Sequence, residues 1–191
     1  MFWGCFHCDI KGPGIFWEKD WGSINAESYC AHTIPIIHGY IELCRRDEIY
    51  LKLMQDGAPG HAAADTATDL QERGIEVIFW PAFSPDLNPI ERVWHIMKNY
   101  LQDNFPEHMS YDRLRSAVKE AWEVIGQFEF RELGKVCRQG VRRSLMRTGF
   151  LQSIRYGNPR SGENASINYY WIATICMGIL TLPWTHSAIA L

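Results

Sequence analysis

The 191-residue sequence predicts an α/β fold, a sheet of strands covered by helices. Short apolar runs typical of strands alternate with helix-length amphipathic segments in the first half of the chain, and amphipathic helices follow. Hydrophobic residues make up 47% of the chain and charged residues 21%, which suffices for one globular core and argues against disorder.

Turn and capping residues set the boundaries of the expected elements. Glycine and proline at 11–14 predict a hairpin turn, Asn25 and Ser110 are expected helix caps, and Gly74 is an expected helix C-cap. The expected elements are strands at 1–8 and 14–18, a helix from 25 to about 45 that bends near Pro35, a strand at 49–55, a helix at 61–73, a strand at 75–80, a helix that begins at Asn88 and Pro89, a helix after Ser110, and one or two basic helices at about 129–147. The two amphipathic helices are expected to bury Ile90, Val93, Trp94, Met97 and Leu101, and Leu114, Val118, Ala121, Trp122 and Ile125.

Charge is distributed unevenly along the chain, although the whole carries a net charge of only −3. Residues 1–109 carry a net −8, residues 110–160 a net +6, and residues 161–191 a net −1. This polarisation fits a metal-binding face beside a polyanion-binding face, and it also fits two ordinary solvated surfaces.

The N-terminal sequence bears on location and on metal binding. It has neither the basic region nor the long apolar region of a secretory signal, so we expect a protein that is not secreted. We further expect it to be nuclear in a eukaryote and cytoplasmic otherwise. Cys5 and Cys8 have a spacing found in zinc sites, but a strand would direct them to opposite faces. We therefore expect small buried thiols there, with zinc as the alternative.

The end of the chain differs from the rest. From Ala165 to Leu191 there is no Lys, Arg, Asp or Glu, and residues 169–182 are strongly apolar up to Pro183. The apolar run is shorter than the ~20 residues of a spanning helix, so we expect a packed terminal helix or a non-native extension, with a membrane anchor as the alternative.

Two carboxylates mark the candidate active site. Asp56 ends a predicted strand, and Glu91 lies in the first turn of a predicted helix, a usual arrangement for a site in an α/β sheet. Converging carboxylates suit Mg²⁺ or Mn²⁺, and two such ions can activate an attacking oxygen and stabilise a leaving phosphate oxygen. By position alone, the alternative is an Asx-turn at Asp56 and a helix cap at Glu91.

Two longer runs around these carboxylates resemble a known family. They are QDGAPGH at 55–61 and SPDLNPIE at 84–91, and they resemble the catalytic core of mariner-superfamily transposases, on the Tc side, within the larger DDE group. Thirty-four residues separate Asp56 from Glu91, a spacing typical of a large branch of that family. The resemblance covers about 1–157, as a partial catalytic domain, and leaves 158–191 as an unmatched apolar tail.

The resemblance implies an RNase-H-like mixed sheet flanked by helices, and DNA cleavage and strand transfer with two Mg²⁺ or Mn²⁺ ions. Asp56 and Glu91 match the second and third acidic residues of the family triad, and each would coordinate metal. Asn88 and Pro89 would support the loop that aims Glu91. The implied partner is DNA, as transposon ends and as target, and a homodimer is a candidate assembly; a membrane is not an expected partner.

The sequence also departs from the family pattern. The first acid of the triad and its strand lie upstream of the position that matches Phe2, so we expect an N-terminally truncated domain, an exposed neighbouring strand and little or no activity. Asp9 and Asp20 are the nearest acids, but neither matches the motif, and Gly57 replaces the usual asparagine. A non-catalytic relic that binds DNA or another subunit is the alternative function.

Two further features remain open. His61 could be another metal ligand or a phosphate contact, or it could cap the short helix or lie at the surface. Arginines at helical spacing form a basic stripe that would contact the DNA backbone or simply face solvent. The members of this stripe are Arg138, Arg142, Arg143 and Arg147.

Overall fold

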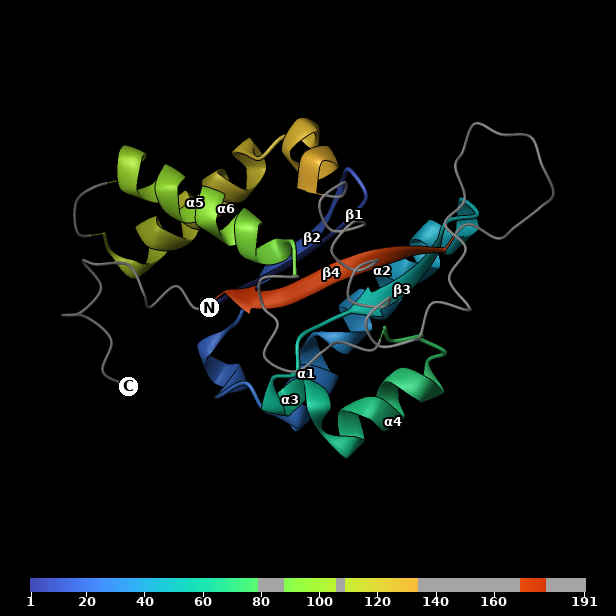
Figure 1. Cartoon of the computed structure of the whole chain (residues 1–191). Helices are drawn as coiled ribbons and strands as arrows, with labels where there is room; N and C mark the ends of the chain where they lie inside the picture. Colours follow the sequence, from blue (N-terminus) through green and yellow to red (C-terminus); the bar gives the residue numbers. More distant parts are fainter. Residues whose placement is uncertain (79–87, 106–108, 134–168, 178–191) are drawn as a thin grey trace, which may run out of the picture.

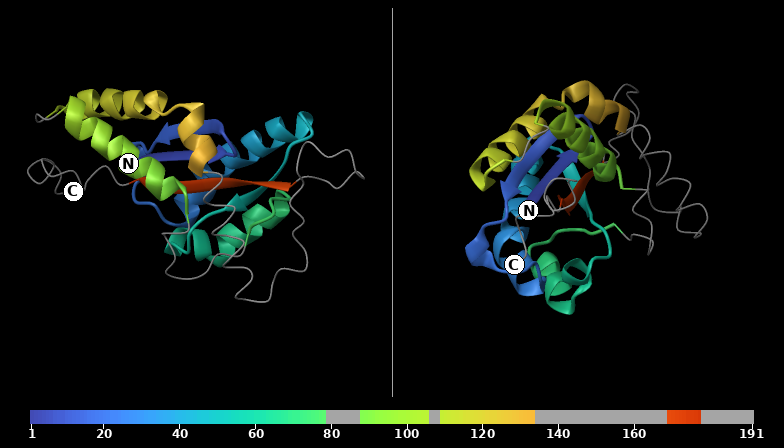
Figure 2. Two further views of the ribbon diagram at one scale, coloured as in Figure 1. Left: turned by 45° about the horizontal axis from the view of Figure 1, so that its top comes forward. Right: turned by 90° about the vertical axis from the view of Figure 1, so that its left-hand side faces the viewer.

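The computed structural model describes residues 1–78, 88–105 and 109–133, and the backbone of 169–177. A four-stranded sheet in the order β2-β1-β4-β3 lies between two groups of helices (Figures 1 and 2). The elements are β1 (Phe2–His7), β2 (Ile10–Phe16), the 3₁₀ turn η1 (Lys19–Trp21), α1 (Ala26–His32), α2 (Ile34–Arg46), β3 (Tyr50–Met54), α3 (Pro59–Ala62), α4 (Ala64–Glu72), α5 (Ile90–Asn104), α6 (Tyr111–Val124) and β4 (Tyr169–Met177). The α/β expectation is therefore confirmed.

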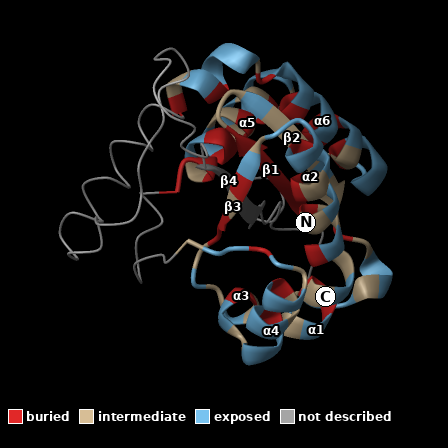
Figure 3. Cartoon of the chain, turned by 90° about the vertical axis from the view of Figure 1, so that its right-hand side faces the viewer, coloured by how far each residue is buried: buried red, intermediate tan, exposed pale blue. Residues whose placement is uncertain are grey.

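Two apolar cores cover the two faces of the sheet. The α5–α6 core takes Phe2 and Phe6 from β1, and the α1–α2 core takes Trp3 and Cys5 from the same strand. This division follows from the alternation of side chains along a strand. All six residues of β1 are buried, as expected for a strand covered by helices on both faces (Figure 3).

The first hairpin forms, but its turn lies earlier than the sequence suggested. The turn is at Cys8 and Asp9, with Cys8 at a positive φ of 51°, and the expected turn residues lie inside β2. There, glycine is needed for close packing. A Cβ on Gly12 would lie 2.6 Å from the Cys5 sulfur, and one on Gly14 would lie 2.6 Å from a Phe2 ring carbon. Pro13 is tolerated because β2 is an edge strand.

The helices expected between Asn25 and Gly74 form, and Asn25 is a cap as predicted. Asn25 accepts a hydrogen bond from the Ser28 backbone N–H, and the Ser28 hydroxyl accepts one from the Asn25 N–H. The expected bend near Pro35 appears as a break between α1 and α2 at Thr33. The helix expected at 61–73 forms as the short α3 and the longer α4, after which Gly74 adopts a φ of 65°.

Helices α5 and α6 bury the apolar faces that the sequence predicted. Ser110 caps α6 by accepting a hydrogen bond from the Arg113 N–H. Trp94 and Trp122 pack against each other at 6.0 Å between ring centroids, so both belong to the core and not to a base-stacking surface. All ten residues expected to face inward from these helices are buried.

Two expected elements, a strand and a terminal helix, differ in the structure. Of the strand expected at 75–80, the described residues form an isolated bridge between Val77 and Leu53. The terminal helix expected in 169–182 is wrong for 169–177, which form the extended strand β4. Hydrogen-bonding positions in the middle of a sheet favour this conformation, because β4 pairs with a strand on each side.

The expected exposed strand edge at β1 is also wrong. β1 pairs with β2 on one side and with β4 on the other. The position next to β1 is thus filled from the C-terminal part of this chain. Among the described residues, no helix is both long enough and apolar enough to cross a membrane.

Candidate acidic site

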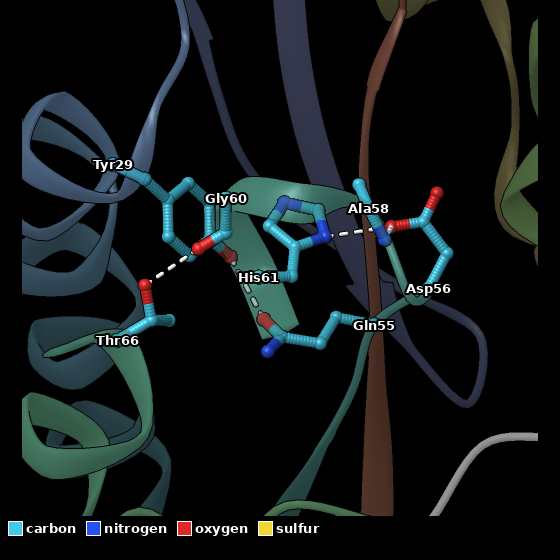
Figure 4. Close-up of polar contacts among 7 residues, drawn as sticks. All are labelled: Tyr29, Gln55, Asp56, Ala58, Gly60, His61 and Thr66. Carbon is cyan, nitrogen blue, oxygen red and sulfur yellow. Dashed lines mark hydrogen bonds and ion pairs between the residues drawn. The ribbon is translucent and has the colours of Figure 1, made fainter. Parts of the chain in front are cut away.

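Asp56 lies just beyond the C-terminal end of β3, where the chain turns into α3. Its side chain is 29% exposed. The Oδ1 atom accepts hydrogen bonds from His61 Nδ1 at 2.6 Å and from the Ala58 backbone N–H at 3.3 Å (Figure 4). Oδ2 points away from His61 and accepts no hydrogen bond from the described part of the chain. Within the described residues, one carboxylate oxygen is therefore held by two donors and the other by none.

His61 is held in place from several directions. Its side chain is only 4% exposed, and its ring packs against the Tyr29 ring at 4.5 Å between centroids. The Tyr29 hydroxyl donates a hydrogen bond to Gln55 Oε1 at 2.9 Å, which links α1 to the residue before Asp56. The Thr66 hydroxyl donates to the Gly60 carbonyl and ties α3 to α4. These contacts hold the His61 ring beside the Asp56 carboxylate.

This setting corrects the expectations for His61. The surface location is wrong, because the residue is buried. Its Nδ1 atom is engaged by the Asp56 carboxylate, so the structure places His61 behind Asp56 as its partner. The sequence signal for this role was the five-residue spacing within the QDGAPGH run, with Pro59 starting the one-turn helix α3 between the two residues.

The surroundings of Asp56 favour its ionised form. Partial burial by itself would raise the pKa of the Asp56 carboxyl, but the hydrogen bond from His61 lowers it. The charge of His61 and the Ala58 N–H lower it further, so the net pKa lies below the usual value for aspartate.

Glu91 lies in the first turn of α5, close to Asp56, and is only partly buried. Burial raises the pKa of the Glu91 carboxyl, and the negative charge of Asp56 raises it further, while Lys98 partly offsets both. The net pKa lies above the usual value for glutamate, although a helix N-terminus favours an ionised acid. The negative charge of Asp56 therefore disfavours the ionised form of Glu91.

Asn88 and Pro89 lie at the start of α5, where Pro89 takes the N-cap position, one residue later than the start predicted at Asn88 and Pro89. Asn88 is buried, and its Oδ1 accepts a hydrogen bond from the Ile90 backbone N–H at 3.3 Å. Pro89 stands directly before the helix in a helical conformation. Ile90 is fully buried in the α5–α6 core, which anchors the turn that carries Glu91.

The two carboxylates suit a hard divalent cation, which binds through one or two protein carboxylates and keeps several waters. Within the described residues, no group of three or more His, Cys, Asp and Glu side chains is arranged to hold a metal ion. Cys5 is buried and Cys8 is partly exposed, and neither belongs to such a group within the described residues. The described site thus consists of two acids, of which one is supported by His61.

Asp9 and Asp20 do not supply a third acid. Asp9 lies at the hairpin turn, where its carboxylate accepts hydrogen bonds from Arg131 at 2.9 Å and from Gln127 at 3.5 Å. Asp20 lies in η1, on the far side of β2 along the chain. The basic stripe at Arg138, Arg142, Arg143 and Arg147 lies outside the described residues, so its contact with DNA stays a prediction.

Comparison with known proteins identifies relatives of the region that carries both carboxylates. The family model of the DDE superfamily endonucleases matches residues 34–115. The chain is 38% identical over 125 residues to the Tc1 transposable element transposase of Caenorhabditis elegans. The matched residues are 65% of this chain and 43% of that protein. It is 38% identical to the Tcb1 transposase of Caenorhabditis briggsae over 104 residues, and these residues are 53% of this chain and 36% of that protein. It is 29% identical to the Tc3 transposase of C. elegans over 82 residues, and these residues are 43% of this chain and 25% of that protein.

The chain therefore spans less than half the length of these curated relatives. The fold is similar to the crystal structure of the catalytic domain of Mos1 mariner transposase, with a TM-score of 0.55 and 17% identity over 66% of this chain and 63% of that one. A second structure, of the Mos1 catalytic domain and Raltegravir with Mg, gives a TM-score of 0.53 and 18% identity over 71% of this chain and 66% of that one. At this identity the likeness shows the fold, which is the RNase-H-like mixed sheet expected from the motifs.

Proposed function

We propose that this chain, which belongs to the Tc and mariner group of DDE transposase catalytic domains, contributes Asp56 and Glu91 as divalent-cation ligands of a site that cuts and joins DNA. The observation that carries the proposal is the state of Asp56. A buried histidine holds one of its oxygens, its pKa is lowered, and its other oxygen accepts no hydrogen bond from the described residues.

The residues present fit Mg²⁺ or Mn²⁺ because both candidate ligands are carboxylates, the hard donors that these ions prefer. Bound divalent cations supply charge that activates an attacking oxygen and offsets charge on the departing phosphate oxygen. Asp56 and Glu91 would hold the cations, and two ions are the expected number. His61 fixes the orientation of Asp56, and Asn88 fixes the helix start that carries Glu91.

A second function is favoured by one observation. Only two acids meet at the described site, whereas a complete triad of the family would supply three. A chain that binds DNA or another transposase subunit without cutting is therefore the alternative. Both functions share the fold, so the distinction between them rests on chemistry.

Metal binding gives the first test. Titration of the whole chain with Mn²⁺, followed by electron paramagnetic resonance of the free ion, should show binding that Asp56→Asn and Glu91→Gln each weaken. Asp65→Asn is a matched control, because Asp65 is an exposed acid at the start of α4. Equal binding by all four proteins would overturn the proposal.

DNA nicking separates the two functions. The whole chain is incubated with Mn²⁺ and an end-labelled duplex, and products are resolved on a denaturing gel. Nicking that Asp56→Ala abolishes would establish an enzyme, and binding without nicking would establish the relic. Neutralising Arg142 and Arg143 together should reduce both DNA affinity and its dependence on salt, because each phosphate contact releases a counterion.

A further inference from the structure

The last strand of the chain lies in the middle of the sheet. β4 pairs antiparallel with β1, with Cys5 opposite Thr174, and it pairs parallel with β3, with Met54 beside Ala173. Among the described residues, β3 has no direct pairing with the β1–β2 hairpin. Figure 1 shows β4 between β1 and β3, and Ile172 and Ala173 are the positions of β4 that pair with both strands.

The two carboxylates are attached to opposite sides of β4. Asp56 follows β3 after a single residue, Gln55. Glu91 belongs to α5, whose Trp94 packs edge-on against Phe2 of β1 at 6.1 Å between ring centroids. The spacing between the two acids therefore depends on how far β3 lies from β1, and β4 occupies that space.

The composition of the segment suits this place. Residues 169–177 contain no charged side chain, and the run YYWIATICM is rich in the aromatic and β-branched residues that favour strands. A strand covered by helices on both faces calls for a continuous apolar run. The 35 residues at 134–168 that separate it from the preceding described residues are long enough for an intramolecular return to the sheet.

We propose that β1 and β3 form a strand-binding site, that its ligand is residues 169–177 of the same chain, and that this strand sets the distance between Asp56 and Glu91. The effect on the two acids rests on the proposed metal-binding function. The strand assignment itself does not. Residues 169–177 are thereby part of the domain that carries Asp56 and Glu91, and they act as a positioning segment.

A single cysteine tests the strand assignment in the whole protein. Cα atoms of directly opposed residues lie about 4.5–5.5 Å apart in an antiparallel pair, within the range that a disulfide spans. Thr174→Cys should form an intramolecular disulfide with Cys5 when the protein is refolded with oxidised glutathione, which takes up the two electrons as the thiols lose two protons. Ala173→Cys is the matched control, because that position stands opposite Phe6.

Peptide mapping by mass spectrometry reads the outcome. The expected result is a disulfide within one chain between Cys5 and the cysteine introduced by Thr174→Cys, with no such link in the control. A folded Thr174→Cys protein without this link would overturn the proposal, and so would a link found only between two chains, since the occupant would then be a second copy.

Mn²⁺ binding tests the positioning effect. Ala173→Pro removes a backbone donor in the middle of β4 and should weaken Mn²⁺ binding at least about tenfold, the loss typical of removing support around a metal ligand. Unchanged affinity in a folded Ala173→Pro protein would overturn the positioning role. If the unaltered protein binds no Mn²⁺, the proposed function fails, and the disulfide still decides the strand assignment.

Discussion

The regions around Asp56 and Glu91 prepare their carboxylates in different ways. Asp56 follows a strand, and a buried histidine and a backbone N–H hold one of its oxygens. Glu91 lies at a helix start, where burial and the charge of Asp56 disfavour its ionised form. The pKa of Asp56 is accordingly lowered and that of Glu91 raised.

This difference shows what a bound cation would have to supply. Asp56 is ready to accept a cation because the protein already stabilises its charge. Glu91 gains most from a cation, since the added positive charge would relieve its repulsion with Asp56. A site of this kind carries unfavourable electrostatic energy in its metal-free state, which is usual where function and stability compete.

Removal of either carboxylate is the change of largest expected effect. Asp56→Asn and Glu91→Gln should each lower Mn²⁺ affinity by more than the roughly 10–100-fold that loss of a supporting residue costs. Isothermal titration calorimetry on the whole chain measures this. Equal losses would indicate that both acids contact the cation alike, and a loss confined to Asp56→Asn would leave Glu91 outside the site.

Removal of His61 separates the support of Asp56 from its charge. His61→Leu should lower Mn²⁺ affinity by roughly 10–100-fold, because Asp56 loses the partner that fixes its orientation. His61→Asn should recover part of this affinity, since its side-chain amide can donate to the Asp56 carboxylate. Equal affinities for the leucine and asparagine variants would contradict a role through this hydrogen bond.

The two acids should make the stability of the metal-free protein depend on pH in opposite ways, and this effect should be smaller than the losses of Mn²⁺ affinity. Because the folded pKa of Asp56 is lowered, its contribution to stability is present above its ordinary pKa and is lost as pH falls through the lowered value. Because the folded pKa of Glu91 is raised, its contribution is present at low pH and is lost as pH rises through the raised value.

The two substitutions should therefore shift the thermal midpoint at pH 7 in opposite directions. Glu91→Gln should raise it and Asp56→Asn should lower it, each through a change of about 1 kcal/mol or less in the free energy of unfolding, because both groups are partly exposed and screened. Differential scanning calorimetry between pH 3 and pH 7 measures the shifts. Shifts of the same sign would break the comparison between the two acids.

The smallest expected effect concerns Lys98, which favours the ionised form of Glu91. Lys98→Met should raise the pKa of Glu91 slightly further and weaken Mn²⁺ binding at pH 6 by about twofold, as is typical for a partly screened charge. The difference should shrink as pH rises to 8, because a larger share of Glu91 is then ionised in both proteins. A larger loss at pH 8 than at pH 6 would indicate another role for Lys98.

Local signals predicted much of this structure from the sequence. The caps at Asn25 and Ser110 and the apolar faces of α5 and α6 are confirmed, because each depends on residues close together in the chain. The placement of Asp56 after β3 and of Glu91 in the first turn of α5 also agrees with the elements that the sequence predicted.

Long-range packing accounts for what the sequence did not predict. The turn at Cys8 was missed because Gly12 and Gly14 serve close contact with Cys5 and Phe2 instead of chain reversal. The strand β4 was missed because its partners lie more than 100 residues away, and an apolar run alone does not distinguish helix from strand. The hydrogen bond between His61 and Asp56 depends on a one-turn helix whose geometry no periodicity reveals.

A double-mutant cycle of Mn²⁺ binding tests the central claim most directly, namely that Asp56 and Glu91 belong to one metal-binding site. Binding free energies are measured for the whole chain, for Asp56→Asn, for Glu91→Gln and for the double variant. The account predicts strong non-additivity, with the double variant little worse than either single one, because the first loss already disrupts the shared site. Additive losses, or no loss in any variant, would contradict it.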